Sequence, residues 1–118
     1  MNAVEPMIPI LVTMELNAAN LKNPPFRSMH EGYAVILEEM NEVDDALIWV
    51  KAFFDDVWRH IKEDRPGMVQ HYARELEKQA IHLAAEVIQV AAMARKLQNS
   101  LEGEYERGTE THAGDAGL

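Results

Sequence analysis

The sequence predicts an all-α protein, a helical bundle, on three observations. Apolar residues recur at steps of three and four along most of the chain, and almost nowhere do they alternate as in strands. Proline-rich breaks separate three segments of this kind. The 118 residues have a globular composition, with 47% hydrophobic and 26% charged residues. A chain of this size supports one ordinary core, so we expect a single helical domain over residues 1–101.

The first segment is a helix over about residues 7–20. Pro9 falls in its first turn, where the missing N–H costs nothing. The helix must end before Asn23-Pro24-Pro25, because a residue that precedes proline is driven towards extended backbone. We therefore expect a loop over residues 23–27.

The second segment begins at Ser28, which with Glu31 three residues later forms a capping-box signature. Gly32 is a weak point near the helix start. An apolar stripe carries the helix to about residue 54 or 60, through Ile36, Met40, Val43, Leu47, Val50 and Phe54. An additional turn or helix is expected over residues 53–61.

The third segment follows a break at Arg65-Pro66-Gly67 and extends over residues 68–101 with an uninterrupted helical period. Residues 102–118 are rich in glycine, glutamate and threonine and have no apolar periodicity. This composition predicts a disordered tail.

The net charge of −9 argues against a nucleic acid polymer as ligand, because no basic cluster offsets its repulsion of a phosphate backbone. A small polyphosphate can still bind when divalent cations lie between its oxygens and protein carboxylates. The chain has no cysteine, its five histidines form no zinc-binding pattern, and it has no P-loop.

No apolar run approaches the roughly 18 residues of a membrane helix. Residues 1–13 lack the basic start and the cleavage site of a signal peptide. We therefore expect a cytoplasmic protein without a membrane partner.

The second helix carries a concentration of acidic residues. Glu38 and Glu42 lie on one strip of its surface, and Glu39 lies between that strip and the apolar stripe. Glu39 and Glu42 can therefore converge at the edge of the core. Like charges at these spacings weaken a helix, which suggests that something neutralises them. A solvated acidic face is the simpler interpretation if this helix is taken alone.

The third helix changes that balance. Twelve of the fifteen residues at positions 80–94 are apolar, and the three exceptions are His82, Glu86 and Gln89, spaced four and then three apart. A helix that is apolar nearly all round is generally buried, so Glu86 should lie in apolar surroundings. A buried carboxylate needs hydrogen bonds, an opposite charge or a metal. His82 alone is more typical of a hydrogen-bonded core histidine than of a ligand.

Antiparallel packing of these two helices would place Glu39 and Glu42 opposite Glu86 and Gln89. Carboxylate and amide oxygens suit Mg²⁺, for which Mn²⁺ is a common substitute. Such a site would connect the protein to the phosphates of a substrate.

At this point the residues resemble a known family. The patterns Glu38-Glu39-x-x-Glu42 and Glu86-x-x-Gln89 resemble the EExxE and ExxD motifs of the all-α nucleotide pyrophosphohydrolases, the MazG-like proteins and their dimeric dUTPase relatives. The flanking sequences, SMHEGYAVILEE at residues 28–39 and AEVIQVAAMA at residues 85–94, are similar to short phage and bacterial members. The resemblance covers about residues 21–97.

The resemblance implies Mg²⁺-dependent hydrolysis of a nucleoside or deoxynucleoside triphosphate to the monophosphate and pyrophosphate. It assigns three residues as metal ligands, Glu39, Glu42 and Glu86. It makes Glu38 either a metal ligand or the base that takes a proton from water. Glu38 and Glu39 are together the expected catalytic residues. His82, Lys51 and Arg95 are candidates for binding the substrate, and Lys96 is a further candidate for neutralising phosphate charge.

Two features depart from the family pattern. Gln89 replaces an aspartate and should bind a cation more weakly, and the residues between the motifs, 43–85, are more numerous than in most members. A non-catalytic member therefore remains an alternative. A rival from another class is a helical interaction module whose acidic strip and Glu86 stripe serve only assembly or the binding of a basic partner. Either protein is expected to form a homodimer or homotetramer, because the apolar helix at residues 80–94 exceeds what two shorter neighbours can cover.

Overall fold

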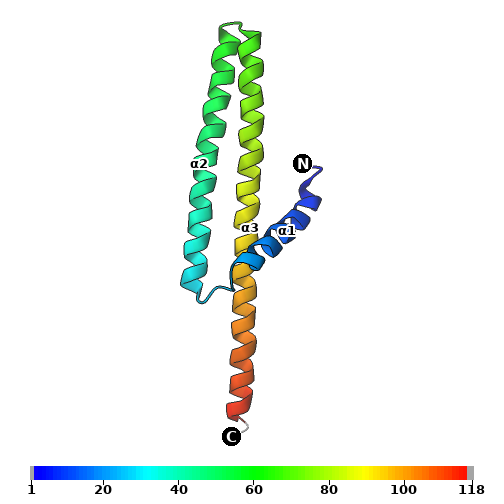
Figure 1. Cartoon of the computed structure of the whole chain (residues 1–118), viewed down its shortest axis with the longest axis vertical. Helices are drawn as coiled ribbons and strands as arrows, with labels where there is room; N and C mark the ends of the chain where they lie inside the picture. The colour runs from blue at the N-terminus through cyan, green and yellow to red at the C-terminus, as the bar shows by residue number, and fades with distance from the viewer. Residues whose placement is uncertain (1, 117–118) are drawn as a thin grey trace. The chain divides into compact units, whose positions relative to one another are not determined.

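The computed structural model describes the backbone of residues 2–116 and the side chains of residues 2–102. A short 3-10 helix, η1 (Glu5–Met7), precedes three α-helices: α1 (Ile8–Lys22), α2 (Met29–Lys62) and α3 (Pro66–Ala116). Figure 1 shows these elements in chain order. Residues 2–116 include no strand, so the prediction of an all-α protein is confirmed. Within the same residues, no helix combines the length and the apolar character needed to cross a membrane.

Helix α1 agrees closely with its predicted position. Pro9 lies in the first turn, and Asn23 adopts extended backbone with φ −132° and ψ 141° before the two prolines. Val12 and Leu16 are buried, one turn apart on the same face. The loop after the helix therefore follows from the conformational limits of Asn23-Pro24-Pro25.

Helix α2 begins with the cap expected at Ser28. The Glu31 backbone N–H donates to Ser28 Oγ at 3.1 Å, which is half of a capping box. The Glu31 carboxylate accepts from Arg27 Nε at 2.9 Å and does not complete the other half. The helix continues without interruption to Lys62, so the extra helix expected over residues 53–61 is the last part of α2 itself.

A tight connection separates α2 from α3. Asp64 has a positive φ of 53°, and the Arg65 backbone N–H donates to the His60 carbonyl at 3.0 Å. Pro66 is the first residue of α3, a position where its fixed φ and missing N–H are tolerated. The third helix was expected to end at residue 101, whereas α3 continues to Ala116 and so includes most of the predicted tail, residues 102–118. The side chains beyond residue 102 lie outside the described residues.

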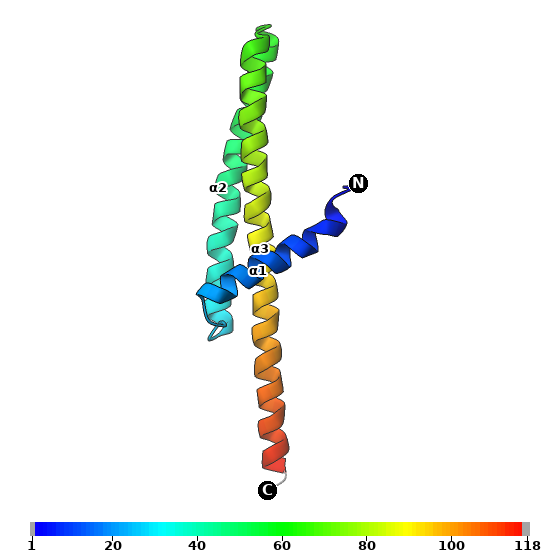
Figure 2. The ribbon, with the colours of Figure 1, turned by 45° about the vertical axis from the view of Figure 1, so that its right-hand side comes forward.

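The chain divides into two compact units. Unit 1 comprises Met1–Ile36 and Gln89–Leu118, and unit 2 comprises Leu37–Ile88. In unit 1, α1 crosses α3 (Figure 2), and Arg95 Nη1 donates to Thr13 Oγ1 at 2.8 Å where they meet. Its buried apolar residues are Val12, Leu16, Phe26, Ala92 and Met93. Whether the two units form the single domain expected over residues 1–101 stays a prediction.

Gly32 has a packing role in unit 1. A Cβ atom at this position would lie 2.7 Å from Leu97 Cδ1 and 3.0 Å from Phe26 Cδ2. The first turns of α2 can approach α3 and the loop this closely only because residue 32 has no side chain. The weak point noted in the sequence is therefore a contact point of the fold.

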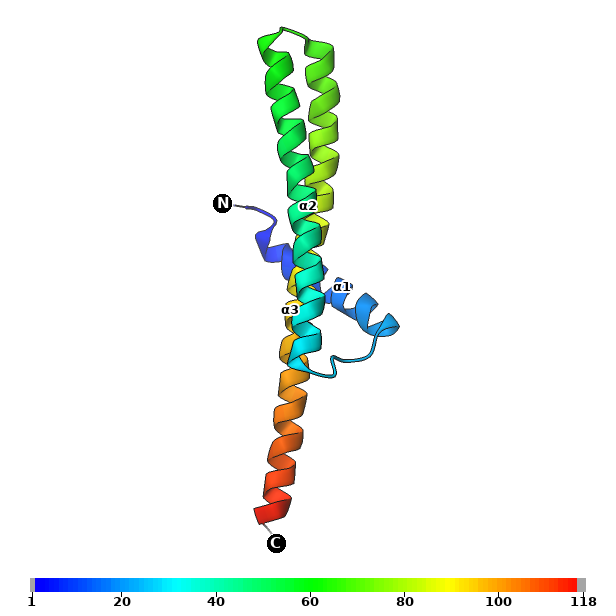
Figure 3. The same ribbon diagram turned by 90° about the vertical axis from the view of Figure 1, so that its left-hand side faces the viewer.

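Unit 2 is an antiparallel pair of helical segments, the later part of α2 and the first part of α3, lying side by side in Figures 1 and 3. Ala46 is a buried residue of α2 in this unit. His60, 4% exposed, stacks on Tyr72 of α3 with ring centroids 5.2 Å apart. Phe53 lies 6.1 Å from the same tyrosine ring. Aromatic contacts therefore hold the two segments together towards the α2–α3 connection.

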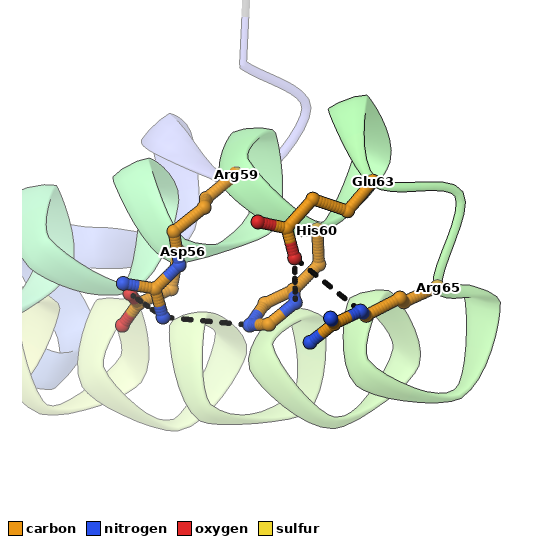
Figure 4. Close-up of polar contacts among 5 residues, drawn as sticks. All are labelled: Asp56, Arg59, His60, Glu63 and Arg65. Atoms are coloured by element: carbon orange, nitrogen blue, oxygen red, sulfur yellow. Dashed lines mark hydrogen bonds and ion pairs between the residues drawn. The ribbon is translucent and has the colours of Figure 1, made fainter.

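Ion pairs surround the buried histidine at that end of unit 2, as Figure 4 shows. Arg59 Nη2 lies 3.1 Å from Asp56 Oδ1 and 3.4 Å from His60 Nε2. Glu63 Oε2 lies 3.3 Å from Arg65 Nε and 3.8 Å from His60 Nδ1. These are mostly exposed pairs of modest energy, and they close the end of the hairpin over His60.

Candidate metal centre

Three carboxylates meet in unit 2, and they are the three that the sequence assigned as metal ligands. Glu39 and Glu42 come from α2 and Glu86 comes from α3, and one oxygen of each lies within 4.8 Å of the others. Glu39 and Glu42 share a helix face because they are three residues apart. The antiparallel packing of the two segments supplies Glu86 opposite them. Acidic groups this close together repel one another unless protons or cations neutralise them.

Glu39 is the most constrained member of this cluster. It is only partly exposed, and its Oε2 atom is buried and receives no hydrogen bond from any donor among the described residues. A buried carboxylate oxygen without a donor carries a large desolvation cost. A cation at this oxygen would remove that cost, so the position fits a metal ligand.

The environment raises the pKa of Glu39 from 4.5 to about 7. Burial is the largest cause, because loss of water penalises the charged form. Glu42 is the next cause, through its negative charge and through the hydrogen bond that two carboxyl groups share when one holds a proton. The charges of Glu86 and Glu38 add smaller contributions. Without a cation, the cluster therefore retains a proton close to neutral pH.

Glu86 is partly buried, as the apolar sequence around it predicted. Its Oε1 atom lies 3.7 Å from His82 Nε2, one turn earlier on α3, and the two form an ion pair when the histidine is protonated. The His82 side chain is 58% exposed, so it is not the core histidine that its apolar helix suggested. An exposed imidazole beside the cluster is accessible to a ligand.

The remaining candidates occupy different places. Glu38 is exposed on α2 next to Glu39, and Lys51 is exposed further along the same helix in unit 2. Arg95 belongs to unit 1, where its guanidinium donates to Thr13. Their assignments as catalytic or substrate-binding residues stay predictions.

Gln89 lies three residues after Glu86 on α3, at the start of the α3 part of unit 1. Its Oε1 atom is buried and has no hydrogen-bond partner among the described residues. An amide oxygen in this state is available to a cation or to a donor on a ligand. Its assignment as a metal ligand stays a prediction.

Lys96 is buried, with 5% of its surface exposed, although we expected this lysine at the surface. Its spacing from two buried residues of the same helix indicates this burial. Lys96 follows Ala92 by four residues and Met93 by three, and both are buried in unit 1. A residue at these spacings shares the inward face of the helix.

The donor set of the cluster fits a hard divalent cation. It offers only carboxylate oxygens, which suit Mg²⁺ or Mn²⁺ and not zinc. The buried Glu39 oxygen and the raised pKa distinguish the cluster from a fully solvated acidic face, and either a proton or a cation would neutralise it. Glu39, Glu42 and Glu86 are the residues that would hold a cation.

Comparisons of the chain with protein-family models, with curated proteins and with solved structures found no match. Membership of the MazG-like family therefore stays a prediction that depends on the two motifs.

Proposed function

We propose that the protein is a metal-dependent nucleoside triphosphate pyrophosphohydrolase, which releases a nucleoside or deoxynucleoside monophosphate and pyrophosphate. The observation that supports this most strongly is the convergence of Glu39, Glu42 and Glu86 within 4.8 Å. These residues come from both motifs, and their oxygens suit the cation that nucleotides carry. Such a cation would offset the repulsion between the clustered carboxylates and a polyphosphate.

In this proposal Glu39, Glu42 and Glu86 hold Mg²⁺ or Mn²⁺, with Gln89 as an additional and weaker ligand. The bound ion supplies Lewis-acid polarisation of the phosphate chain and a lowered pKa for water. Glu38 is exposed beside the cluster and either takes the proton from the attacking water or adds a ligand oxygen.

Proton release from Glu39 accompanies cation binding. The carboxyl group has a pKa of about 7, so in the free protein it keeps its proton in much of the population at neutral pH. Ligation requires the ionised form. Cation affinity should therefore rise with pH through this range.

Three basic side chains would receive the substrate. His82 is exposed next to Glu86 and reaches a phosphate or a base when a nucleotide lies over the cluster. Lys51 and Arg95 are the further candidates for offsetting phosphate charge. We place this activity in the cytoplasm, the expected location of nucleotide pools.

A second candidate function is a non-catalytic interaction or oligomerisation module, and exposed apolar side chains favour it. Helix α1 exposes Ile10, Leu11 and Met14, and α2 exposes large apolar and aromatic residues including Trp49 and Phe54. Exposed apolar residues in this number indicate a protein interface. A homodimer or homotetramer would cover them, and this assembly is compatible with either function.

The test is incubation of the purified protein with each common NTP and dNTP, with Mg²⁺ or Mn²⁺, and chromatographic separation of the products. We expect monophosphate and pyrophosphate only when metal is present. Glu39→Gln and Glu86→Gln should each lower kcat/KM by at least about 100-fold, because each weakens the charge stabilisation that a metal gives the transition state. Gln89→Asp should lower the Mg²⁺ concentration that gives half of the maximal rate.

Glu77→Gln is the matched control, since Glu77 is exposed on α3 within unit 2 and outside the cluster. It should retain full activity. Absence of turnover with every nucleotide, together with a melting temperature that does not respond to millimolar Mg²⁺, would reject the hydrolase and leave the interaction module.

A further inference from the structure

Lys96 is a buried cation with an incomplete set of partners. It lies on α3 in unit 1 with 5% of its surface exposed, and its Nζ atom lies 4.9 Å from the centre of the Phe26 ring. Within the described residues, the ammonium has no hydrogen bond and no ion pair. Three N–H donors are therefore held inside the protein beside an aromatic face.

The contacts around Lys96 offset only part of the cost of burying it. Removing an ammonium from water costs more free energy than a cation–π contact returns. The nearby Glu31 carboxylate is bound to Arg27 at 2.9 Å. The pKa of Glu31 is lowered mainly by its hydrogen bond with Arg27, and the charge of Lys96 is the smallest contributor. Among the residues whose side chains are described, no carboxylate is thus committed to Lys96.

Lys96 lines a cavity of about 350 Å³ in unit 1, formed by the end of α1, the loop that follows it and α3. The other lining residues are three asparagines, two prolines and a serine: Asn20, Asn23, Asn99, Pro24, Pro25 and Ser100. Carboxamides can donate to an anion and can also accept from a polar ligand. The two prolines fix φ at their own positions, which limits the conformations of the loop part of the wall.

We propose that this cavity binds a small metabolite through an oxyanion, a phosphate or a carboxylate group, which pairs with Lys96. An oxyanion would accept charge-assisted hydrogen bonds from the Lys96 ammonium. It would supply the hydrogen-bond acceptors that the described residues do not provide. The volume matches a small-molecule site and exceeds the size of the anion alone. The asparagines would hydrogen-bond the rest of the ligand. None of the three clustered glutamates lines this cavity, so the site is independent of the proposed hydrolase.

Binding can be measured by calorimetric titration with inorganic phosphate and, separately, with acetate, in EDTA and at constant ionic strength. Wild type should bind at least one of the two anions, and the tighter one identifies the class of oxyanion. Lys96→Met keeps the aliphatic stem against Phe26 and should weaken binding at least about tenfold, through loss of a charge-assisted hydrogen bond. Lys78→Met is the control, because Lys78 is an exposed lysine of α3 in unit 2.

A second variant tests the cavity even if Lys96→Met fails to fold. Asn99→Ala changes an exposed residue of the cavity wall, leaves the ammonium in place, and should also weaken binding. Glu39→Gln should bind the anion as wild type does, which separates this site from the candidate metal centre. Equal binding by wild type and folded Lys96→Met, or no binding of either anion by wild type, would overturn the proposal.

Discussion

The raised pKa of Glu39 makes the stability of the metal-free protein depend on pH. The folded protein holds the Glu39 proton with a pKa of about 7, whereas the ordinary value is 4.5. The folded state therefore binds this proton more tightly than the unfolded chain does. The free energy of unfolding must fall as the pH rises from 4.5 to about 7, and the stabilisation is fully present only below that window.

The size of this effect follows from the same pKa. Each pKa unit corresponds to about 1.4 kcal/mol, so the span from 4.5 to about 7 sets an upper limit of about 3 kcal/mol. Partial exposure of Glu39 reduces that limit, because water screens the charges around it. We expect a loss of about 1 to 3 kcal/mol.

Urea unfolding followed by far-UV circular dichroism, in EDTA and at one protein concentration, measures this loss. Glu39→Gln removes the titrating group and keeps its shape, so its stability should change less with pH. Above the window, the variant should be more stable than wild type. Glu77→Gln, an exposed change on α3, should show the wild-type slope.

Magnesium provides the second half of this experiment. If the cluster binds Mg²⁺, millimolar Mg²⁺ should restore the stability of wild type above pH about 7 and have little effect near pH 4.5, where Glu39 is protonated. It should not stabilise Glu39→Gln to the same extent. Parallel pH profiles for wild type and Glu39→Gln in EDTA would refute the assignment of a high pKa to this residue.

Two further predictions concern the fold. Gly32→Ala should destabilise the protein by about 1 kcal/mol in urea unfolding, because the close contact of the new Cβ with Leu97 and Phe26 outweighs the gain in helix propensity. Gly67→Ala is the control and should be neutral or stabilising, because a Cβ at residue 67 would meet no neighbouring atom within 4 Å. An unchanged or raised stability of the first variant would show that the neighbours move aside at no cost. Ser28→Ala should cost about 1 kcal/mol in the same assay through loss of the α2 cap, and an equal stability would mean that water replaces the hydroxyl.

The positions of the helices could be predicted largely from the sequence, because local rules set them. Asn23-Pro24-Pro25 ends α1, Ser28 caps α2, and Pro66 begins α3. The end of α2 was harder to place. The expected end was about residue 54 or 60, whereas the helix continues to Lys62, and His60 near that end packs against Tyr72 of α3.

Some features of the candidate metal centre could likewise be predicted from the sequence, and others depend on helix packing. Helical spacing was sufficient to place Glu39 and Glu42 on one face, and the apolar surroundings of Glu86 were sufficient to predict its partial burial. The packing of α2 against α3 brought the three within 4.8 Å and left one Glu39 oxygen without a donor. A pKa of about 7 depends on those neighbours and on lost hydration, neither of which a linear pattern contains.

The sequence by itself determined the helical class, the breaks between helices and the glutamates that converge, because these follow from backbone limits and from the period of a helix. Only the tertiary structure decided which polar groups lose their water. His82 is exposed although its helix is apolar, and Lys96 is buried although it is charged. The reason is that burial depends on what packs against a helix face, and that surface comes from segments far away in the chain.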